Sequence, residues 1–318
     1  MVRRARGLSD ALPVHVAVLF FGLAGVLGRL TALPALLIVL GRVVFAAPTL
    51  YIVVRARGLS LATRSRQDRA LLVGQGVLLV AHWSAFFQAI NVSSVAIGLL
   101  AFSSFPLFTA LLEPLLLRQP ASRVQVAGAL CVLPGVYLLA PSLALSSAAM
   151  RGVLWGLLAG ATFALLSVSN RWLGRRYASP TISLYQDATA ALILLPVLLV
   201  LHPARLFAPR QLLLLVALGV CCTALAHTLF IEGMRRVTAQ FASLVATLEP
   251  VWGILFALVL LREVPSGRTL IGGAIILAGA LLPALARGPM PPLLAGDPLG
   301  NPSRSRTMPP RPEDYSSV

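Results

Sequence analysis

The ionisable residues inside the long apolar runs of this chain are few, and they are the residues that could do chemistry. Arg42 lies near the middle of the run Ala35–Val54, where it could hold a carboxylate group, and Asp187 lies in the run Thr181–Leu201. A charged side chain inside a bilayer is costly unless it is paired or hydrated, so each is a candidate for function. The alternatives are a structural ion pair, or an arginine whose head group reaches the membrane interface.

Two acids lie close to prolines in other apolar runs. Glu249 directly precedes Pro250, and a proline removes one helix hydrogen bond, which frees a carbonyl where a site could form. Glu249 could exchange a proton for a substrate, or it could be a protonated acid bonded to a neighbouring helix. Pro106 predicts a matching helix break, and Glu113 lies about two turns further on, close to the same face.

Histidines and aromatic residues complete the set of candidates. A histidine can shuttle protons near neutral pH, although a buried one often serves only as a hydrogen-bonding group in the packing. A tryptophan or tyrosine can wall a site for an organic molecule, or it can simply pack or anchor at the interface. The candidates of these two kinds are His82, Trp83, Tyr185, His227 and Trp252.

The amino-acid composition indicates whether these residues belong to a soluble protein or to a membrane protein. Of 318 residues, 58% are hydrophobic and 11% are charged, and the mean hydropathy is +0.88. A soluble domain has roughly a quarter of its residues charged, so an ordinary soluble enzyme is excluded. All 26 basic residues are arginines that lie mostly between the apolar runs, which indicates loop charges that fix topology and argues against nucleic-acid binding.

Ten apolar runs are long enough, or nearly so, to cross a membrane as helices, because a span needs about 20 mostly apolar residues. The sequence therefore predicts an all-α membrane protein with ten transmembrane helices. The runs are Pro13–Gly28, Ala35–Val54, Ala70–Ile90, Val95–Leu117, Val124–Ala140, Gly152–Val168, Thr181–Leu201, Gln211–Ile231, Phe241–Leu261 and Thr269–Ala286.

The arginine distribution predicts the orientation of these helices. If the N-terminus is cytoplasmic, 19 arginines fall on the cytoplasmic side and 6 on the other side. The positive-inside rule then places both termini in the cytoplasm. We expect residues 1–12 to form a cytoplasmic N-terminal segment and residues 287–318, which are rich in Pro, Ser and Arg, to form a disordered cytoplasmic tail.

The chain repeats itself at an offset of 144 residues. Residues 86–140 align without a gap with residues 230–284, and the identical pairs include Pro106 with Pro250 and Gly128 with Gly272. Units of five helices are therefore predicted at residues 13–140 and 152–286. Because five is an odd number, the second unit must enter the membrane from the opposite side. Such inverted repeats are common in secondary transporters, which expose a site at the repeat interface to alternate sides.

The repeat also relates the candidates to each other. Arg42 corresponds to Gln186, which is next to Asp187, so Arg42 and Asp187 are expected to face each other across the pseudo-two-fold axis. His82 and Trp83 correspond to Ala226 and His227.

At this level of detail the sequence resembles the EamA-type family of the drug/metabolite transporter superfamily. The motif Leu248-Glu249-Pro250-Val251-Trp252, followed by Leu260-Leu261-Arg262-Glu263, carries the resemblance, with Gly272 and Gly279 after it. The resemblance implies a ten-helix carrier, commonly an exporter of amino acids or related metabolites across the bacterial inner membrane, often coupled to protons. Gln119 stands where the family often has a glutamate, and Glu113 is unusual, so the coupling ion stays open.

Other functional classes lack their signatures. An intramembrane enzyme acting on lipid or isoprenoid substrates is the main alternative, but no acidic metal-binding cluster or nucleophile–base pair is present. A channel would need a filter loop, and an ATP-driven pump would need a Walker A sequence. We expect no cofactor and no metal. The expected partners are a small-molecule substrate, protons and the lipid bilayer. The Gly156-x-x-x-Gly160 spacing predicts close helix packing, with a homodimer as the alternative.

Overall fold

The computed structural model describes residues 8–117, 123–140, 142, 144–201, 207–233 and 245–286. Throughout these residues the chain is helical, with short connections and no strand. The expected tail 287–318, residues 1–7, Gln119 and residues 241–244 of the ninth run lie outside this part of the chain, and the side chain of Glu113 does too.

In the first half, helices begin where a proline or serine precedes an apolar run. Pro34 precedes α2, and the Ser65 and Ser94 hydroxyls cap α3 and α4 by accepting from Asp68 N and Ile97 N. The helices are α1 (Leu8–Thr31), α2 (Ala35–Ala56), α3 (Arg66–Val92), α4 (Val95–Phe102), α5 (Phe105–Leu117) and α6 (Arg123–Leu139).

The second half has the same order of helices, with one segment wound as a π-helix. Its described elements are α7 (Ala148–Leu173), α8 (Ser179–Leu194), α9 (Val197–Leu201), α10 (Pro209–Gly219), η2 (Val220–Leu225), α11 (Ala226–Gly233), α13 (Glu249–Leu260) and α14 (Gly267–Ala286). The segments α10, η2 and α11 follow one another without a break and together correspond to α3.

Five helices in the described residues are long and apolar enough to cross a membrane. They are Ala11–Thr31, Ala35–Ala56, Arg66–Val92, Ala148–Asn170 and Pro209–Gly233. Shorter apolar stretches of 10–17 residues are Val95–Thr109, Val126–Leu139, Glu249–Leu260 and the Gly267–Leu282 part of α14. The prediction of an all-α protein is therefore confirmed for the described chain, while the count of ten spans stays a prediction.

Three of the predicted spans are not continuous helices in the described residues. One is the run Phe241–Leu261, which breaks at Thr247 and Leu248 directly before α13. The run Val95–Leu117 breaks at Ser103 and Ser104, whose hydroxyls donate to carbonyls of the preceding turn, and α5 begins directly afterwards. Pro106 and Pro250 are the second residues of α5 and α13, so each lies in a first helical turn, where the missing N–H costs nothing. The run Thr181–Leu201 breaks between α8 and α9, next to Pro196.

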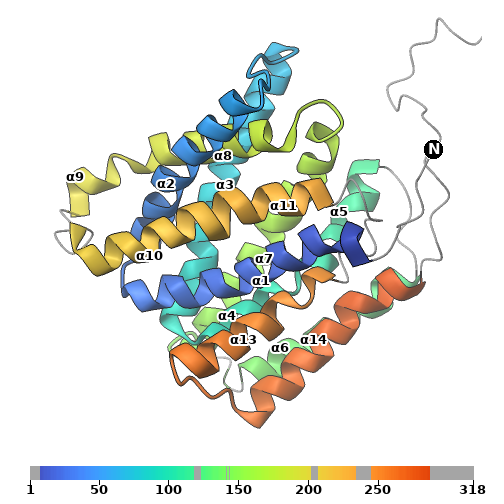
Figure 1. Cartoon of the computed structure of the whole chain (residues 1–318). Helices are drawn as coiled ribbons and strands as arrows, with labels where there is room; N and C mark the ends of the chain where they lie inside the picture. Colours follow the sequence, from blue (N-terminus) through green and yellow to red (C-terminus); the bar gives the residue numbers. More distant parts are fainter. Residues whose placement is uncertain are drawn as a thin grey trace, which may run out of the picture.

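The two halves repeat each other in helix position and in packing. Ala35 and Ser179, Phe105 and Glu249, and Arg123 and Gly267 begin corresponding helices, and each pair is 144 residues apart. The helix α3 packs on α7, as α10–α11 packs on α1, and α5 packs on α7, as α13 packs on α1 (Figure 1). For each of these contacts, the corresponding helices of the other half make the same contact. Two halves related by a two-fold axis are expected to do this.

The corresponding helices α6 and α14 run antiparallel against each other. A Cβ atom on Gly135 would lie 2.8 Å from the Gly272 carbonyl oxygen, and one on Gly279 would lie 2.8 Å from that of Gly128. Residue numbers therefore rise along one helix as they fall along the other. The glycines that identified the repeat are thus the points at which its two halves meet.

Other glycines pack inside the chain. Gly156 and Gly160 on α7 lie against Ala101 and Phe102 at the end of α4, so their spacing serves an internal contact. This finding removes the sequence evidence for a homodimer, because the predicted small-residue face is already covered.

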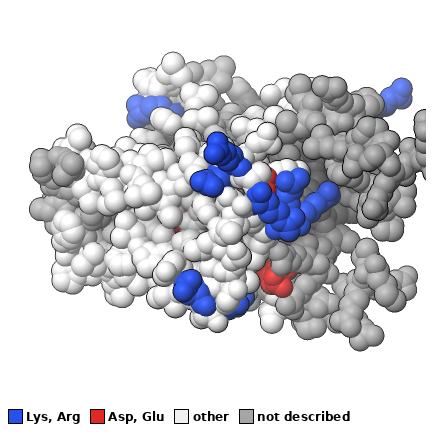
Figure 2. Space-filling model, turned by 90° about the horizontal axis from the view of Figure 1, so that it is seen from above, with Lys and Arg blue, Asp and Glu red and all other residues white. Residues whose placement is uncertain are grey.

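The face shown in Figure 2 is mostly uncharged, apart from groups of arginines and a few acidic side chains. Figure 2 looks down on the molecule from above the view of Figure 1 and shows blue basic side chains gathered over part of a white surface. The exposed arginines at or beside the α2–α3 and α7–α8 connections are Arg55, Arg57, Arg64, Arg66, Arg69 and Arg175. Exposed apolar side chains such as Ile52, Leu192 and Val259 cover much of the helical surface, as lipid contact requires.

Candidate functional site

Arg42 on α2 is the buried cation around which the site is built, and it is only 2% exposed. Its guanidinium carbon lies 3.8 Å from the centroid of the Trp83 ring on α3. Its Nε donates to Thr223 Oγ1 over 2.9 Å, and its Nη2 donates to the Cys222 carbonyl over 3.3 Å. Stacking and hydrogen bonds fix the cation in place. A guanidinium has five N–H donors, so donors are left for a ligand.

The acceptors for Arg42 come from the π-helical segment η2. The wider turn lets the Thr223 hydroxyl donate to the Leu218 carbonyl, five residues earlier, over 2.7 Å while its oxygen accepts from Arg42. Gly219 allows this approach, because a Cβ there would lie 2.5 Å from the Arg42 carbonyl oxygen. Short π-helical turns are frequent at functional sites.

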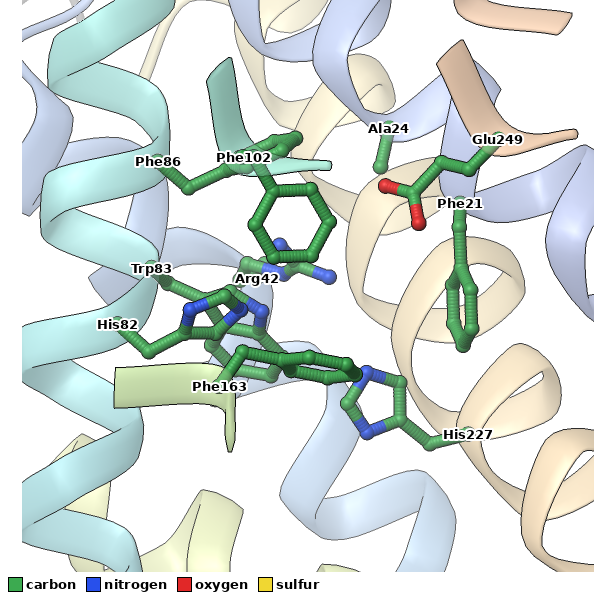
Figure 3. Close-up of a pocket in the computed structure, with 10 residues that line it drawn as sticks. All are labelled: Phe21, Ala24, Arg42, His82, Trp83, Phe86, Phe102, Phe163, His227 and Glu249. Atoms are coloured by element: carbon green, nitrogen blue, oxygen red, sulfur yellow. The ribbon is translucent and has the colours of Figure 1, made fainter. Parts of the chain in front are cut away.

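A cavity of about 40 Å³ adjoins the Arg42 head group. Its lining comes from α1, α2, α3, α4, α7, α11 and α13, so both halves contribute to it. The lining residues are Phe21, Ala24, Arg42, His82, Trp83, Phe86, Phe102, Phe163, His227 and Glu249, which Figure 3 shows around a common space. Such a volume holds water molecules but falls well below the roughly 300 Å³ at which pockets for organic ligands begin. A ligand of metabolite size therefore requires the walls to move apart.

The cavity lies where equivalent positions of the two halves meet. Trp83 and His227 are 144 residues apart, and their ring centroids are 5.3 Å apart in an edge-on contact. Phe21 on α1 and Phe163 on α7, which belong to corresponding helices, also both line the cavity. Direct contact between equivalent residues places the pseudo-two-fold axis through this cavity.

The two histidines have different surroundings. The Nδ1 atom of His82 lies 2.9 Å from the Ala159 carbonyl oxygen, which can only accept, so Nδ1 carries a proton. The ring of His227 packs edge-on against Phe21 at 5.3 Å. Both rings lie among aromatic side chains, where they can contact an organic ligand.

Glu249 brings a carboxylate to the cavity from the first residue of α13, and it is 8% exposed. In Figure 3 its carboxylate points into the space shared with Arg42 and Phe21. A negative charge is favoured at a helix N-terminus by the helix dipole. The cavity thus presents a cation, a carboxylate and aromatic walls, which together suit an amphipathic molecule with charged groups.

Asp187 on α8 was predicted to face Arg42, but its carboxylate does not form the ion pair with Arg42 that was the alternative interpretation of the sequence. It is 1% exposed, and neither carboxylate oxygen has a hydrogen-bond partner among the described residues. Arg42 interacts with it electrostatically but is hydrogen-bonded instead to Thr223 and Cys222, because the π-helix brings these oxygens closer. Its neighbour Gln186 donates to both Gln75 and Asn170.

Two other predicted site residues, Tyr185 and Trp252, are not among the residues that line the cavity. The Tyr185 hydroxyl donates to the Leu61 carbonyl over 2.7 Å in the α2–α3 connection. Trp252 stacks on Phe256 one turn later in α13, with centroids 6.4 Å apart. Glu113 belongs to α5, and its side chain is outside the described part.

Sequence reasoning missed the apolar walls of the cavity, namely Phe21, Ala24, Phe86, Phe102 and Phe163. One signal for them was present, because Phe21 and Phe163 each lie eight residues before an arginine in corresponding helices. That match indicated a repeat, and residues repeated near a pseudo-two-fold axis are expected to converge on it.

A second polar cluster joins the two halves at one end of the molecule. Asp68 on α3 accepts from the Tyr177 hydroxyl over 2.6 Å and forms an ion pair with Arg176 at 3.1 Å. The Tyr177 oxygen in turn accepts from the Arg64 backbone N–H over 2.8 Å. Burial raises the pKa of the Tyr177 phenol, and its hydrogen bond to Asp68 adds to the effect. We call this cluster of Arg64, Asp68, Arg176 and Tyr177 the end latch.

Comparison with known proteins identifies relatives across nearly the whole helical region. A family model described as the EamA-like transporter family matches residues 11–140 and 150–284. A protein of Archaeoglobus fulgidus named only as an uncharacterized transporter is 29% identical over 68% of this chain and 77% of the relative. The uncharacterized transporter YxxF of Bacillus subtilis is 24% identical over 88% of this chain and 90% of the relative.

Solved structures share this fold, and one of them is a crystal structure. It superposes with a TM-score of 0.63 at 22% sequence identity, covering 87% of this chain and 96% of the other.

Proposed function

We propose a specific transport cycle on the premise that this chain belongs to the EamA-like transporter family. Membership makes it a multi-pass membrane protein, and the transporters among its relatives support a general transport function. Beyond this, we propose a secondary transporter that works by alternating access. Its cargo would be amino acids or related small metabolites, exported across a bacterial inner membrane with proton coupling.

The contact between Trp83 and His227 carries the proposal of alternating access. These equivalent residues meet at 5.3 Å beside Arg42, so the cavity lies on the axis that exchanges the two halves. If the halves exchange their conformations, the cavity stays in place and its opening changes sides. The antiparallel contact between α6 and α14 supports the inverted orientation of the two halves, and the arginine distribution supports cytoplasmic termini for the proposed ten spans.

The chemistry of the cavity supports the proposed substrate class. Arg42 can bind a carboxylate through its remaining donors, and Glu249 can bind an ammonium group. The phenylalanine walls suit an apolar side chain between these charges. The intramembrane enzyme considered from the sequence is not favoured, because the relatives are named as transporters.

Exchange in vesicles of purified protein tests the proposal. Vesicles loaded with one unlabelled L-amino acid at a time should take up the same labelled amino acid by counterflow for at least one member of the set. Overexpression in bacteria should lower the intracellular level of that amino acid or raise tolerance to its toxic analogue. Absence of movement of every candidate in either direction, with and without a proton gradient, would reject the carrier.

A further inference from the structure

A column of buried oxygen atoms on α8 lies apart from the residues that line the cavity. In the described part of the chain, the side chains with buried oxygens and no hydrogen-bond partner are Ser84, Ser179, Ser183 and Asp187. The last three follow each other at four-residue spacing and therefore share one face of α8. Each is 1% exposed, and the column extends about 12 Å along the helix.

Ser179 and Ser183 differ from several other hydroxyls in the helices or at their C-caps. Those hydroxyls donate to the carbonyl four residues earlier, which is a usual way to satisfy a hydroxyl inside an apolar helix. Examples are Thr49, Ser93, Ser103, Thr109, Thr162 and Ser169. Ser183 makes no such bond to the Ser179 carbonyl. Buried polar groups without protein partners are typically satisfied by water, so the column points to a hydrated path.

The column begins near the α2–α3 connection and ends near Arg42. Ser179 is in the first turn of α8, near Thr181, whose hydroxyl donates to the Ser60 carbonyl of the α2–α3 connection over 3.3 Å. Asp187 is two turns further along, where Arg42 interacts with it electrostatically. The column therefore connects the end of the molecule that carries the latch with the back of the Arg42 site.

The charges around Asp187 favour a proton as the species that it binds. Arg42 on α2 is the charged group that acts on Asp187, and its positive charge disfavours a metal cation beside it. The titratable groups around Arg42 on the neighbouring elements are His82 on α3, Cys222 on η2, His227 on α11 and Glu249 on α13. A proton needs no coordination shell and can pass along hydroxyls and water.

We propose that Asp187 binds the coupling proton of the transport cycle, and that Ser183 and Ser179 carry this proton through water between Asp187 and the latch end. This assignment rests on the proposed transport function. A hydronium ion at the Ser179 end gives its proton to the water path, and the carboxylate of Asp187 becomes a neutral carboxyl. Release runs in reverse along the same path. Each step changes the charge beside Arg42, which couples the proton to the ligand held there.

Infrared difference spectroscopy on the full-length protein in detergent tests the proton site without a substrate. Stepping the pH should change the carbonyl band of a protonated carboxyl, and the part due to Asp187 should be absent in Asp187→Asn. Asp187→Glu should restore a titrating band at a shifted frequency. Spectra that are identical for the wild type and Asp187→Asn at every pH would overturn the assignment.

Transfer into D₂O tests the path. The Asp187 carboxyl band should shift as its proton exchanges, and the double variant Ser179→Ala/Ser183→Ala should slow this shift by about tenfold, roughly the effect of one lost hydrogen bond. Ser169→Ala is the matched control, because its hydroxyl is already bonded within α7. An unchanged exchange rate in the double variant would overturn the path even if Asp187 titrates.

Vesicle measurements separate this assignment from the transport proposal. With an amino acid that shows counterflow, a proton gradient should drive net movement in the wild type but not in Asp187→Asn. Retained proton-driven movement in that variant would reject Asp187 as the coupling residue while leaving the carrier intact. If no amino acid moves even in the wild type, the transport proposal fails, and the infrared result still decides whether Asp187 titrates.

Discussion

The Tyr177 hydroxyl donates to Asp68 over 2.6 Å and thereby ties the connection between α7 and α8 to the start of α3. Asp68 is 1% exposed and belongs to the first half of the chain, whereas Tyr177 belongs to the second. A bond of this kind must break if the two halves separate at this end. We therefore expect the end latch to stabilise the conformation in which this end is closed.

Replacing Asp68 by alanine should open the latch end more often. The change removes the acceptor for Tyr177 and the ion-pair partner of Arg176, and a hydrogen bond to a charged group contributes about 1.5–3 kcal/mol, or roughly a 10- to 100-fold change in the opening equilibrium. A cysteine introduced by Ser179→Cys, in a background without the native cysteines, reports this opening. A membrane-impermeant thiol reagent should label it roughly 10- to 100-fold faster in the Asp68 variant. Gln67→Ala, an exposed neighbour, should leave the rate unchanged.

The contribution of Tyr177 to the latch should persist throughout the neutral pH range. Its pKa is raised above the ordinary value of about 10, so the folded protein holds this proton more tightly than the unfolded chain does. The contribution is therefore fully present below pH 10 and is lost only as the pH rises through the higher folded value. Tyrosinate absorbance of the wild type minus that of Tyr177→Phe should show a titration above pH 10. A titration at or below that value would contradict the burial argument.

Arg42 should be needed for binding a carboxylate but not for membrane insertion. Lysine cannot reproduce both the stacking on Trp83 and the separate bonds to Thr223 and Cys222, so Arg42→Lys should fail nearly as fully as Arg42→Ala. Counterflow of the active amino acid should fall by at least about tenfold, the equivalent of roughly one charge-assisted hydrogen bond. Arg268→Gln, which removes a peripheral arginine, is the control variant, and its level in the membrane should be normal. Normal flux in Arg42→Ala would exclude the carboxylate clamp.

The helical architecture could be predicted from the sequence because lipid imposes a simple rule on composition. Apolar runs must be helical to satisfy their own backbone groups, and glycine and proline in register identify a repeat even when leucines do not. The same reasoning predicted a helix break at Pro106, whereas the break lies just before it at Ser103 and Ser104, because an apolar run does not show where side-chain hydroxyls replace the helix hydrogen bonds.

The charged members of the cavity could be predicted, but their partners could not. Arg42 and Glu249 were recognisable because charges are rare inside spans, and both line the cavity. The predicted facing pair of Arg42 and Asp187 is not an ion pair, because the π-helix at Val220–Leu225 offers Thr223 as a closer acceptor, and nothing in the sequence marks a π-helix. Phe102 was missed because one phenylalanine in an apolar run looks like any other.

The contact between α6 and α14 predicts equal sensitivity at two sites that are far apart in the sequence. A methyl group on Gly135 would meet the Gly272 carbonyl at 2.8 Å, and one on Gly279, the equivalent position 144 residues later, would meet the Gly128 carbonyl at the same distance. Because backbone atoms cannot move aside easily, Gly135→Ala and Gly279→Ala should each destabilise the protein by about 1–3 kcal/mol. Thermal unfolding in detergent measures the loss.

Gly74→Ala is the matched control, since a methyl group there has no neighbour within 4 Å and should lower the midpoint of unfolding little or not at all. If the halves are related by the two-fold axis, the losses for the equivalent residues Gly135 and Gly279 should agree within error. The double variant should then lose about the sum of the two, unless the helices separate after the first substitution. A large loss at one glycine and none at the other would show that the contact is not symmetric, and would weaken the case for two equivalent halves.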